Sequence, residues 1–543
     1  MTKKLGKWHG FETPKHHQAF INADIYTNQT LADRARQLAE TKADEKIFPN
    51  DPQSPTFASI LEDAQALAAS LCDMGILQGD VVSFQMPNWH EAAVINLACA
   101  VAGFVANPIV IIYRHNEVKF MLQDSKAKLF FVSEHFANFD FSQMMDEIAA
   151  ECPDLKHIAY VRSKKTGNYD ELLATGRGLA LPNYQTDPNA VKLVLYTSGT
   201  TGRPKAVLHS HNTLMNVLDV CAKHWQIQPG DHVLMPSPVT HISGYSNGLE
   251  LPFAAQTRTV LMEKWNAGDA LQLIQQYQVA GTVAATPFLQ ELTQLAAEQK
   301  TALPSLRYFA CGGAAVPPDI VYNANQQFGQ VCVFRVFGSS EAPLVTLGYQ
   351  GDMQADLAAE TDGEAIDYEL RIVDEQEQLV ASGIEGEVQV RGPSMLLGYA
   401  LLEDTKGAVT EDGFFRTGDL GFINDKGALC ISGRKKDLII RGGENISAKE
   451  IEDVLHLSPD IAEASVVSIP HKRLGEGVCA FIILKEGSAA DTQNILDFVM
   501  QSGLAKQKTP EKIIFTQDFP RTASGKIQKN ILRDQIKDQM VGG

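Results

Sequence analysis

The sequence lacks the features of a secreted, metal-scaffolded or membrane-spanning protein. Its eight cysteines are scattered, with no CxxC pair and no histidine at zinc-ligand spacing, so neither a disulfide framework nor a structural metal is indicated. The basic N-terminus has no apolar segment behind it that would make a secretory signal. The longest apolar stretch, residues 92–112, is interrupted by Asn96, Asn107 and Pro108 and fits a buried helix followed by a buried strand. We therefore expect reduced cysteines, no transmembrane segment and a cytoplasmic location.

Positive charge is also in short supply. The chain carries 47 basic and 65 acidic residues, for a formal net charge of −18. This balance argues against wholesale nucleic-acid binding, because no global positive field attracts a phosphate backbone. Small anions are a separate matter, since local nests of N–H groups and single lysines can hold them. With 543 residues, 44% of them hydrophobic, the chain is long enough to bury several cores.

The chain changes texture twice along its length. Up to about residue 345, short apolar strands alternate with helical segments, which predicts largely parallel sheets with helices on both faces. After about residue 360, apolar and polar residues alternate as in half-exposed antiparallel strands. A last unit begins near Lys436, and the capping box Ser447-Ala-Lys-Glu450 opens its first helix. We expect an α/β protein with a large N-terminal domain of αβ-layered sheets plus a small antiparallel β subdomain (residues 1–435), followed by a small mobile α+β C-terminal domain (residues 436–543).

The strongest motif is a segment rich in glycine and hydroxyl groups, YTSGTTGRPK at 196–205, directly after the apolar run KLVL. Its N–H groups, its hydroxyls and the charge of Lys205 can wrap a polyphosphate. It has no Gly-Lys-Ser/Thr triplet and is therefore not a Walker A loop. A flexible linker is the alternative, but a fixed Pro-Lys ending behind a buried strand is unusual for a linker. The predicted phosphate-binding residues are Thr197, Ser198, Gly199, Thr200, Thr201 and Lys205.

This segment resembles the phosphate loop of the adenylate-forming superfamily, which comprises acyl-CoA synthetases, peptide-synthetase adenylation domains and luciferases. Further motifs follow in the family's order, so that the resemblance covers the chain from about residue 30 to its end. The closest similarity is to bacterial short- and medium-chain acyl-CoA ligases, including those for cyclohexanecarboxylate. The further motifs are HISGY at 241–245, CGGAA at 311–315, FGSSE at 337–341, RTGD at 416–419, GRKKD at 433–437, GGEN at 442–445 and PRTASGK at 520–526.

The resemblance implies a role for a residue in each motif. Lys526 is implied as the catalytic lysine that bridges carboxylate and α-phosphate. Glu341 is implied as the Mg²⁺ ligand, which suits a hard cation bound mainly by oxygen. Ser340 would hydrogen-bond the α-phosphate and His241 would gate the carboxylate pocket. The other implied residues are Gly312, Gly313, Ala314, Phe337 and Gly338 around adenine, Asp419 on the ribose hydroxyls, Arg434 on the nucleotide, Lys436 as hinge, and Gly442 and Gly443 along the pantetheine tunnel.

The sequence departs from the family pattern at several places. Phe337 replaces the usual tyrosine and Ser340 the usual threonine, which keeps the ring face and the hydroxyl. Arg335 stands where the family often has an amide, so the contact with the adenine edge stays open. Ile242 occupies the position of an aspartate that pairs with the substrate amine in amino-acid-activating members, and this disfavours an amino-acid substrate.

The implied reaction has two half-reactions. A carboxylate attacks the α-phosphorus of MgATP to give acyl-AMP and pyrophosphate, and CoA then takes the acyl group and releases AMP. The expected cofactors are ATP, Mg²⁺ and coenzyme A, and the partner is a small carboxylic acid rather than nucleic acid. The candidates for the walls of the acid pocket, Tyr245, Phe288 and Leu289, suit a short- or medium-chain or alicyclic apolar acid.

Other readings stay open on the sequence alone. The main alternative is a stand-alone acyl-AMP ligase that loads a separate carrier protein. A non-catalytic nucleotide sensor is disfavoured, since every inspected position keeps a competent side chain. Luciferase-like oxygenation would use the same motifs, and a homo-oligomer is neither indicated nor excluded.

Overall fold

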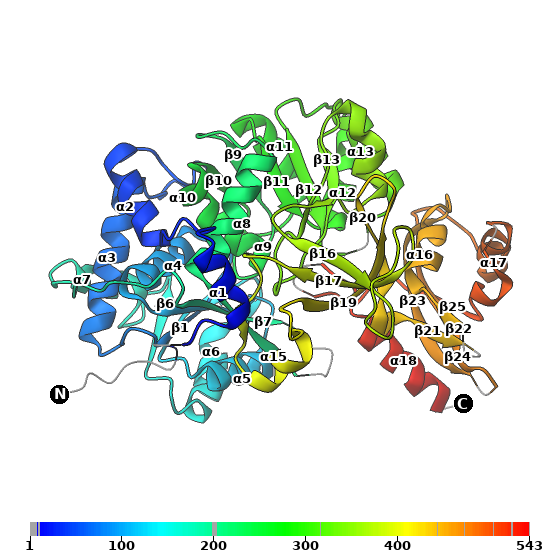
Figure 1. Cartoon of the computed structure of the whole chain (residues 1–543). Coiled ribbons are helices and arrows are strands. Elements are labelled where there is room, and N and C mark those ends of the chain that lie inside the picture. Colours follow the sequence, from blue (N-terminus) through cyan, green and yellow to red (C-terminus); the bar gives the residue numbers. More distant parts are fainter. Residues whose placement is uncertain are drawn as a thin grey trace.

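The computed structural model describes residue 8 and residues 11–197, 203–314, 316–441, 444–471, 473–502, 504–522 and 525–541. Two sheets, stacked through a helical layer, form the large N-terminal part of the chain (Figure 1). The first sheet is largely parallel, and β8 and β18 join its edge in antiparallel pairing. Its seven strands run in the order β18 (Gly398–Tyr399), β8 (Lys205–Ser210), β7 (Val191–Thr197), β2 (Val105–Pro108), β1 (Val81–Gln85), β3 (Leu129–Ser133) and β6 (His157–Val161).

The second sheet is parallel throughout. Neighbouring residues of its strands point to opposite faces, so Val233 packs toward the first sheet while Leu234 packs outward. Both faces are covered, and the strands are accordingly almost continuously apolar. The strand order is β10 (Arg258–Leu261), β9 (His232–Met235), β11 (Gly281–Ala284), β12 (Tyr308–Gly312) and β13 (Val333–Val336).

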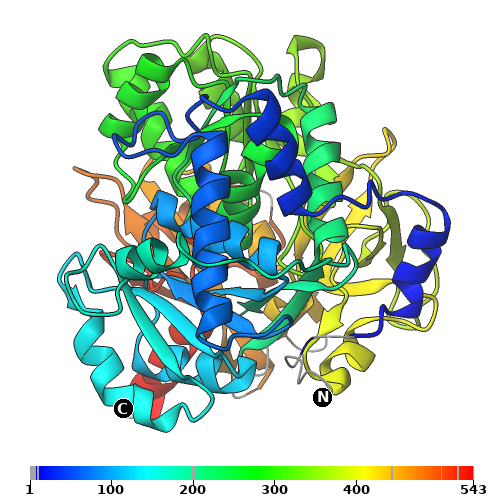
Figure 2. The same cartoon turned by 90° about the vertical axis from the view of Figure 1, so that its left-hand side faces the viewer.

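Helices alternate with the two sheets in layers. The inner layer holds the largest apolar core; in Figure 2 its long blue helix runs between the green part of the chain above and the cyan part below. Its helices are α2 (Leu31–Thr41), α3 (Phe57–Asp73), α4 (His90–Ala102), α7 (Tyr169–Gly176), α8 (His211–His224) and α10 (Leu251–Ala255). The outer helices are α5 (His115–Ser125) and α6 (Phe141–Ile148) on the first sheet, and α11 (Ala267–Tyr277), α12 (Thr286–Glu298), α13 (Pro318–Phe328) and α14 (Ala355–Glu360) on the second.

An antiparallel sheet follows the two layered sheets in the sequence, as the change of texture predicts. It packs against β8 and the segment after β13 through a separate small core. Its strands are β16 (Glu369–Val373), β17 (Gly386–Arg391), β19 (Phe415–Ile423) and β20 (Leu429–Arg434), and the short helix α15 (Leu402–Ala408) lies between β18 and β19. Small outlying elements are α1 (Lys15–Asn22) and the strand pairs β4 (His135–Phe136) with β5 (Phe139–Asp140) and β14 (Thr346–Leu347) with β15 (Glu364–Ala365).

The C-terminal part forms a sheet of its own beyond a 3₁₀ turn, η4 (Lys435–Asp437), and lies on the right in Figure 1. Helices α16 and α17 cover one face of this sheet, and α18 covers the other. Its elements are β21 (Ile439–Arg441), β22 (Glu444–Ile446), α16 (Ala448–His456), β23 (Ile461–His471), β24 (Gly475–Leu484), α17 (Thr492–Gln501), β25 (Lys512–Phe515) and α18 (Lys529–Val541). Layered sheets, antiparallel subdomain and C-terminal α+β unit together confirm the predicted fold class.

Two helices show how the caps form, one of them at the capping box that the sequence predicts. Thr30 caps α2 and forms a full capping box with Asp33. At α16 the Ser447 hydroxyl accepts from the Glu450 N–H at 3.3 Å, but the Glu450 carboxylate pairs with Lys508 at 2.6 Å instead of returning to the cap. The predicted box is therefore only half formed, because a charged partner from another segment competes for the carboxylate. Among the described residues, no helix is long and apolar enough to cross a membrane.

Candidate active site

A cavity of about 610 Å³ lies where the two layered sheets, the antiparallel sheet and the C-terminal unit meet. Its lining comes from the ends of β7, β12 and β13, from α8 and α15, from β19 and β20, and from the C-terminal unit. Residues more than 300 positions apart in the sequence thus face one space. Of the predicted site residues, the cavity brings together Thr197, Lys205, His241, Gly312, Gly313, Gly338, Ser340, Glu341, Arg434, Lys436 and Lys526.

The ends of the predicted phosphate loop lie on this cavity. Thr197 closes β7 and is paired with Lys205, the first residue of β8, so the loop connects two hydrogen-bonded antiparallel strands. Arg203 donates to Asp404 of α15 at 2.7 Å, and the Lys205 amine lies 3.7 Å from the same carboxylate. Two cations are therefore held beside the loop by one acidic residue. The loop residues Ser198, Gly199, Thr200 and Thr201 lie outside the described part of the chain.

Glu341 is oriented by neighbours from two other elements. The Tyr399 hydroxyl donates to its Oε1 at 2.9 Å, and the Thr197 hydroxyl approaches the same oxygen at 3.5 Å. Tyr399 is in place because β18 adds to the edge of β8. No cluster of three or more His, Cys, Asp or Glu side chains suited to a metal occurs among the described residues. A single carboxylate beside a phosphate loop fits Mg²⁺, which keeps water and takes its remaining ligands from phosphate oxygens.

Two glycines let the backbone pass closely beside the cavity. A Cβ on Gly312 would lie 2.5 Å from the Val336 carbonyl, and one on Gly338 would lie 2.4 Å from the Leu344 N–H nitrogen. Both positions therefore exclude any other residue. Gly313 has a φ of +83° and lies beside the Lys526 side chain. Ala314 is exposed and Phe337 half-buried; neither lines the cavity.

Asp419 and Arg434 form a pair across β19 and β20. They are register partners, and Arg434 Nε donates to Asp419 Oδ1 at 2.7 Å. Burial raises the pKa of Asp419, although Arg434 and Lys526 oppose that shift. Asp419 is 4% exposed and does not itself line the cavity, whereas the preceding Thr417 and Gly418 do.

Lys526 reaches the cavity from the C-terminal unit. Burial, followed by the charge of Arg434, lowers the pKa of its amine from 10.5 to about 8, and Asp419 and Glu341 act in the opposite direction. Burial, followed by the charge of Lys526, lowers the pKa of His241 to about 4, so this imidazole is neutral at physiological pH. His241 Nδ1 accepts from the Ser243 N–H at 3.4 Å and caps the short helix α9 (Ile242–Gly244).

The wall residues of the acid pocket differ from those expected. Tyr245 is fully buried and its hydroxyl donates to Asn96 at 2.6 Å, behind the cavity. Phe288 stacks on Trp265, and Leu289 packs into the outer core. None of the three lines the cavity, because Tyr245 points into the inner core and the other two, on α12, pack in the outer core. The lining residues of α9 and the turn after it are Ile242, Ser243, Ser246 and Asn247, together with Val217 and Leu218 of α8.

Arg335 also has a different place from the one considered for it. It is 4% exposed, and both its Nη2 contacts with the Asp362 carboxylate measure 2.7 Å. Asp362 also accepts from the Ile431 N–H at 2.8 Å, so the pair joins β13 to β20. Arg335 does not line the cavity and offers nothing to an adenine edge. The predicted tunnel residues Gly442 and Gly443 lie outside the described residues.

Two family models match this chain. The AMP-binding enzyme family matches residues 34–400, and the AMP-binding enzyme C-terminal domain matches residues 450–526. The chain belongs to the AMP-binding enzyme family. This confirms the resemblance to adenylate-forming enzymes that the motifs indicate, and with it the expectation of ATP as a cofactor.

The relatives extend over nearly the whole chain. The medium-chain fatty-acid–CoA ligase of Escherichia coli (strain K12) is 32% identical over 531 residues, which are 95% of this chain and 92% of the relative. The indoleacetate–CoA ligase of Aromatoleum aromaticum is 30% identical over 89% of this chain and 93% of its own length. Among solved structures, ATP-bound MatB from Rhodopseudomonas palustris superposes with a TM-score of 0.83 at 28% identity, covering 94% of this chain and 99% of that one.

Proposed function

We propose that this protein is an AMP-forming acyl-CoA synthetase that activates an apolar monocarboxylic acid of short to medium size. The observation that carries the proposal is one cavity whose lining includes Lys526, Glu341 and Lys205 together with apolar side chains. Family membership supports the ATP-dependent first step, and the relatives' names support a CoA thioester as product.

The acid end of the cavity argues for one carboxylate only. Its described lining from α8, from residues 237–247 and from β11 contains no Asp, Glu, Lys or Arg. A second carboxylate on the substrate would therefore be buried without a cation, which is costly. Val217, Leu218, Ile242 and Val283 instead offer apolar contact to a hydrocarbon chain or ring.

The roles proposed for the charged residues follow from where charge changes during the reaction. Adenylation brings a carboxylate toward a triphosphate, so the site must neutralise crowded negative charge. Lys205 would hold the β- and γ-phosphates, Glu341 would hold Mg²⁺, and Lys526 would bridge the incoming carboxylate and the α-phosphate. Neutral His241 would border the carboxylate without competing as a cation. Bound MgATP supplies the activated phosphorus and the pyrophosphate leaving group.

The nucleotide would be held by the residues around Asp419. Its carboxylate can accept two hydroxyl donors, as a ribose requires. Arg434 keeps that carboxylate oriented, and Lys436 in the turn η4 is the proposed hinge between domains 1–435 and 436–543. Gly442 and Gly443 remain the proposed path for the pantetheine arm.

The first experiment measures pyrophosphate release and thioester formation from ATP, CoA and a panel of acids, from acetate through medium chains to cyclohexanecarboxylate, aryl acids and dicarboxylates. We expect a CoA thioester with one optimum among monocarboxylic acids of short to medium size. Pyrophosphate and acyl-AMP without thioester would favour the carrier-loading alternative. A dicarboxylate as best substrate would contradict the pocket argument.

The role of Lys526 is tested by separating the two half-reactions. Lys526→Ala should abolish adenylation while sparing thioester formation from supplied acyl-AMP, because the amine acts only where triphosphate and carboxylate meet. Equal loss in both half-reactions would contradict the assignment. Lys435→Ala is a matched control, since this exposed neighbour of the hinge pairs with Glu387 at 3.1 Å.

A further inference from the structure

A buried polar network lies directly behind the acid end of the cavity. Lys192 of β7 and Glu250 form an ion pair in which the side chains are 1% and 0% exposed. Asn96 of α4 donates to the same Glu250 oxygen at 3.0 Å, and the Tyr245 hydroxyl donates to Asn96 at 2.6 Å. Lys192 lies at an irregularity in the β7–β8 pairing, the kind of bulge that re-aims a side chain.

The network joins the two ends of a π-helical turn, η2 (Tyr245–Glu250). Residues i and i+5 face the same neighbour here, as the i→i+5 hydrogen bonding of a π-helix requires. In an α-helix the same two residues would lie about 140° apart around the axis. One Asn96 side chain could then no longer reach both Tyr245 and Glu250. The contacts of Asn96 therefore select the π-helical register over the α-helical one.

The π turn determines which side chains face the acid. Ser246 and Asn247, in its middle, line the cavity, while Tyr245 and Glu250 point away from it into the network. The turn continues directly into α10, so an α-helical register would rotate these lining residues. A buried ion pair adds little net stability compared with apolar residues of the same volume. The buried Lys192–Glu250 pair is better explained by the π turn that it holds in position.

We propose that Asn96, with Lys192, Glu250 and Tyr245, is a positioning device that holds the π turn and thereby sets the acid selectivity of the pocket. This inference rests on the proposed function, because it assigns the residues that fix the shape of the proposed acid site. None of the four side chains touches the acid. They act through Ser246 and Asn247.

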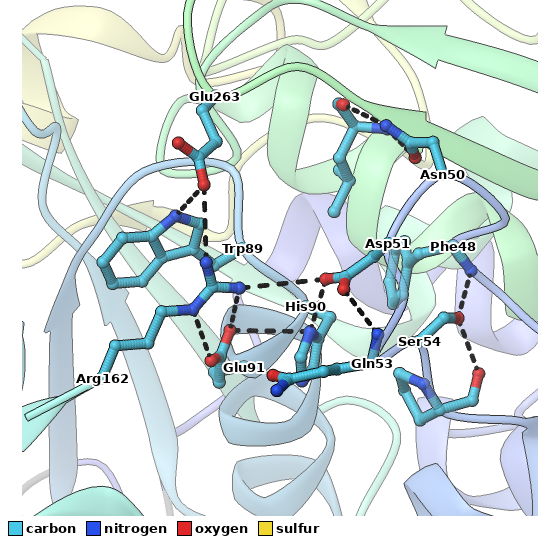
Figure 3. A network of polar contacts seen from close by, with 12 residues as sticks. Phe48, Asn50, Asp51, Gln53, Ser54, Trp89, His90, Glu91, Arg162 and Glu263 are labelled. Carbon is cyan, nitrogen blue, oxygen red and sulfur yellow. Dashed lines mark hydrogen bonds and ion pairs between the residues drawn. The ribbon is translucent and has the colours of Figure 1, made fainter.

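A matched control is available on the same helix. Glu91, 5% exposed in the first turn of α4, is held by Arg162 through contacts of 2.8 and 3.2 Å. Figure 3 shows this second network, in which the Arg162 side chain lies over Trp89 and is joined to Glu91, Asp51 and Glu263. Glu91→Gln weakens a buried polar contact of α4, as Asn96→Leu does, but in the described part of the chain the Glu91 carboxylate has no hydrogen bond or ion pair with the π turn.

The experiment compares Asn96→Leu, Tyr245→Phe and Glu91→Gln with the unmodified enzyme. Pyrophosphate release at saturating ATP gives kcat/KM for each acid of a straight-chain series, and the KM for ATP and the Tm are measured in parallel. We expect Asn96→Leu to change the ratio of kcat/KM between acids at least tenfold, with the KM for ATP within twofold. Tyr245→Phe, which removes only one hydroxyl, should shift the ratio in the same direction by less. Glu91→Gln should lower the Tm and keep the original ratios.

The acid profiles of the variants can contradict the inference in several ways. A folded Asn96→Leu enzyme with the original acid profile would overturn it, and if Asn96→Leu does not fold, an unchanged profile in Tyr245→Phe would do so. The same change in profile with Glu91→Gln would also overturn it, because general loosening would then be the cause. An unmodified enzyme that adenylates no acid would overturn the proposed function and this inference together. Pyrophosphate release without thioester formation would contradict only CoA as the acyl acceptor in the proposed function, and the test of acid selectivity would still apply.

Discussion

The pH dependence of adenylation should report the charge of Lys526. Its amine has a pKa of about 8, because the cavity removes it from water and Arg434 repels it. The protonated form is the one that can bridge two anions, so activity should fall as pH rises through this pKa. About nine-tenths of the free enzyme is protonated at pH 7 and about one-tenth at pH 9. We therefore expect kcat/KM for ATP to drop about tenfold between these values, since this quantity reports the free enzyme.

The assay is pyrophosphate release without CoA, which keeps the thiol of the second substrate out of the profile. His241 is neutral throughout this range, since its pKa lies at about 4, and it contributes no slope. Lys436 is the other nearby amine whose pKa burial lowers, so a variant must separate the two. Lys526→Arg does so, because a guanidinium stays protonated throughout this pH range.

Lys526→Arg should be slower than the unmodified enzyme, but its profile should stay flat between pH 7 and pH 9. A falling limb that persists in Lys526→Arg would assign the ionisation to another group, with Lys436→Met as the next variant. A flat profile in the unmodified enzyme would refute the argument altogether. The pKa of Lys526 would then lie near its ordinary value, and the C-terminal unit would not place the amine in this cavity.

Two further substitutions test the surroundings of the phosphate loop. Tyr399→Phe removes the hydrogen bond to Glu341, and a hydrogen bond to a charged acceptor contributes about 1.5–3 kcal/mol. Adenylation should therefore slow by about 10- to 100-fold and require more Mg²⁺. A titration with Mg²⁺ measures this, and an unchanged Mg²⁺ requirement would contradict the assignment. Asp404→Asn removes the negative charge that pairs with Arg203 and Lys205, so the KM for ATP should fall. The decrease should be less than about fivefold, because exposed ion pairs contribute about 0–1 kcal/mol, and it should become smaller at high salt. An increased KM would contradict this prediction and show that Asp404 assists ATP binding.

The sequence predicts those parts of the protein in which the interacting residues lie close together along the chain. The change from apolar strands to alternating ones marks the antiparallel subdomain, and the cap of α2 is formed by Thr30 and Asp33, which are three positions apart. Motifs such as FGSSE carry their glycine and carboxylate together, and Gly338 and Glu341 accordingly share the cavity. Within one motif, sequence neighbours are also spatial neighbours.

The sequence does not predict contacts between residues that are far apart along the chain. Tyr399 lies outside all the sequence motifs, and it contacts Glu341 only because β18 pairs with β8. Tyr245 was expected to line the pocket, but a π turn and Asn96, 149 positions away, direct it behind the pocket. The sequence suggests only an adenine edge as a possible partner for Arg335, whereas in the structure its guanidinium pairs with the Asp362 carboxylate. Each of these outcomes depends on tertiary contacts that override local pattern.

The electrostatics of Lys526 connect the two parts of the molecule. Burial is the main cause of the lowered pKa of its amine, and repulsion by Arg434 and Lys436 adds to it, while Asp419 and Glu341 attract the amine and oppose the shift. A bound triphosphate would reverse that balance, because it adds several negative charges among these cations. Under the proposed mechanism, placement of Lys526 in the cavity would thus be favoured by ATP and disfavoured once pyrophosphate has left. The same charges would then favour withdrawal of the C-terminal unit after adenylation, without any need for a separate signal.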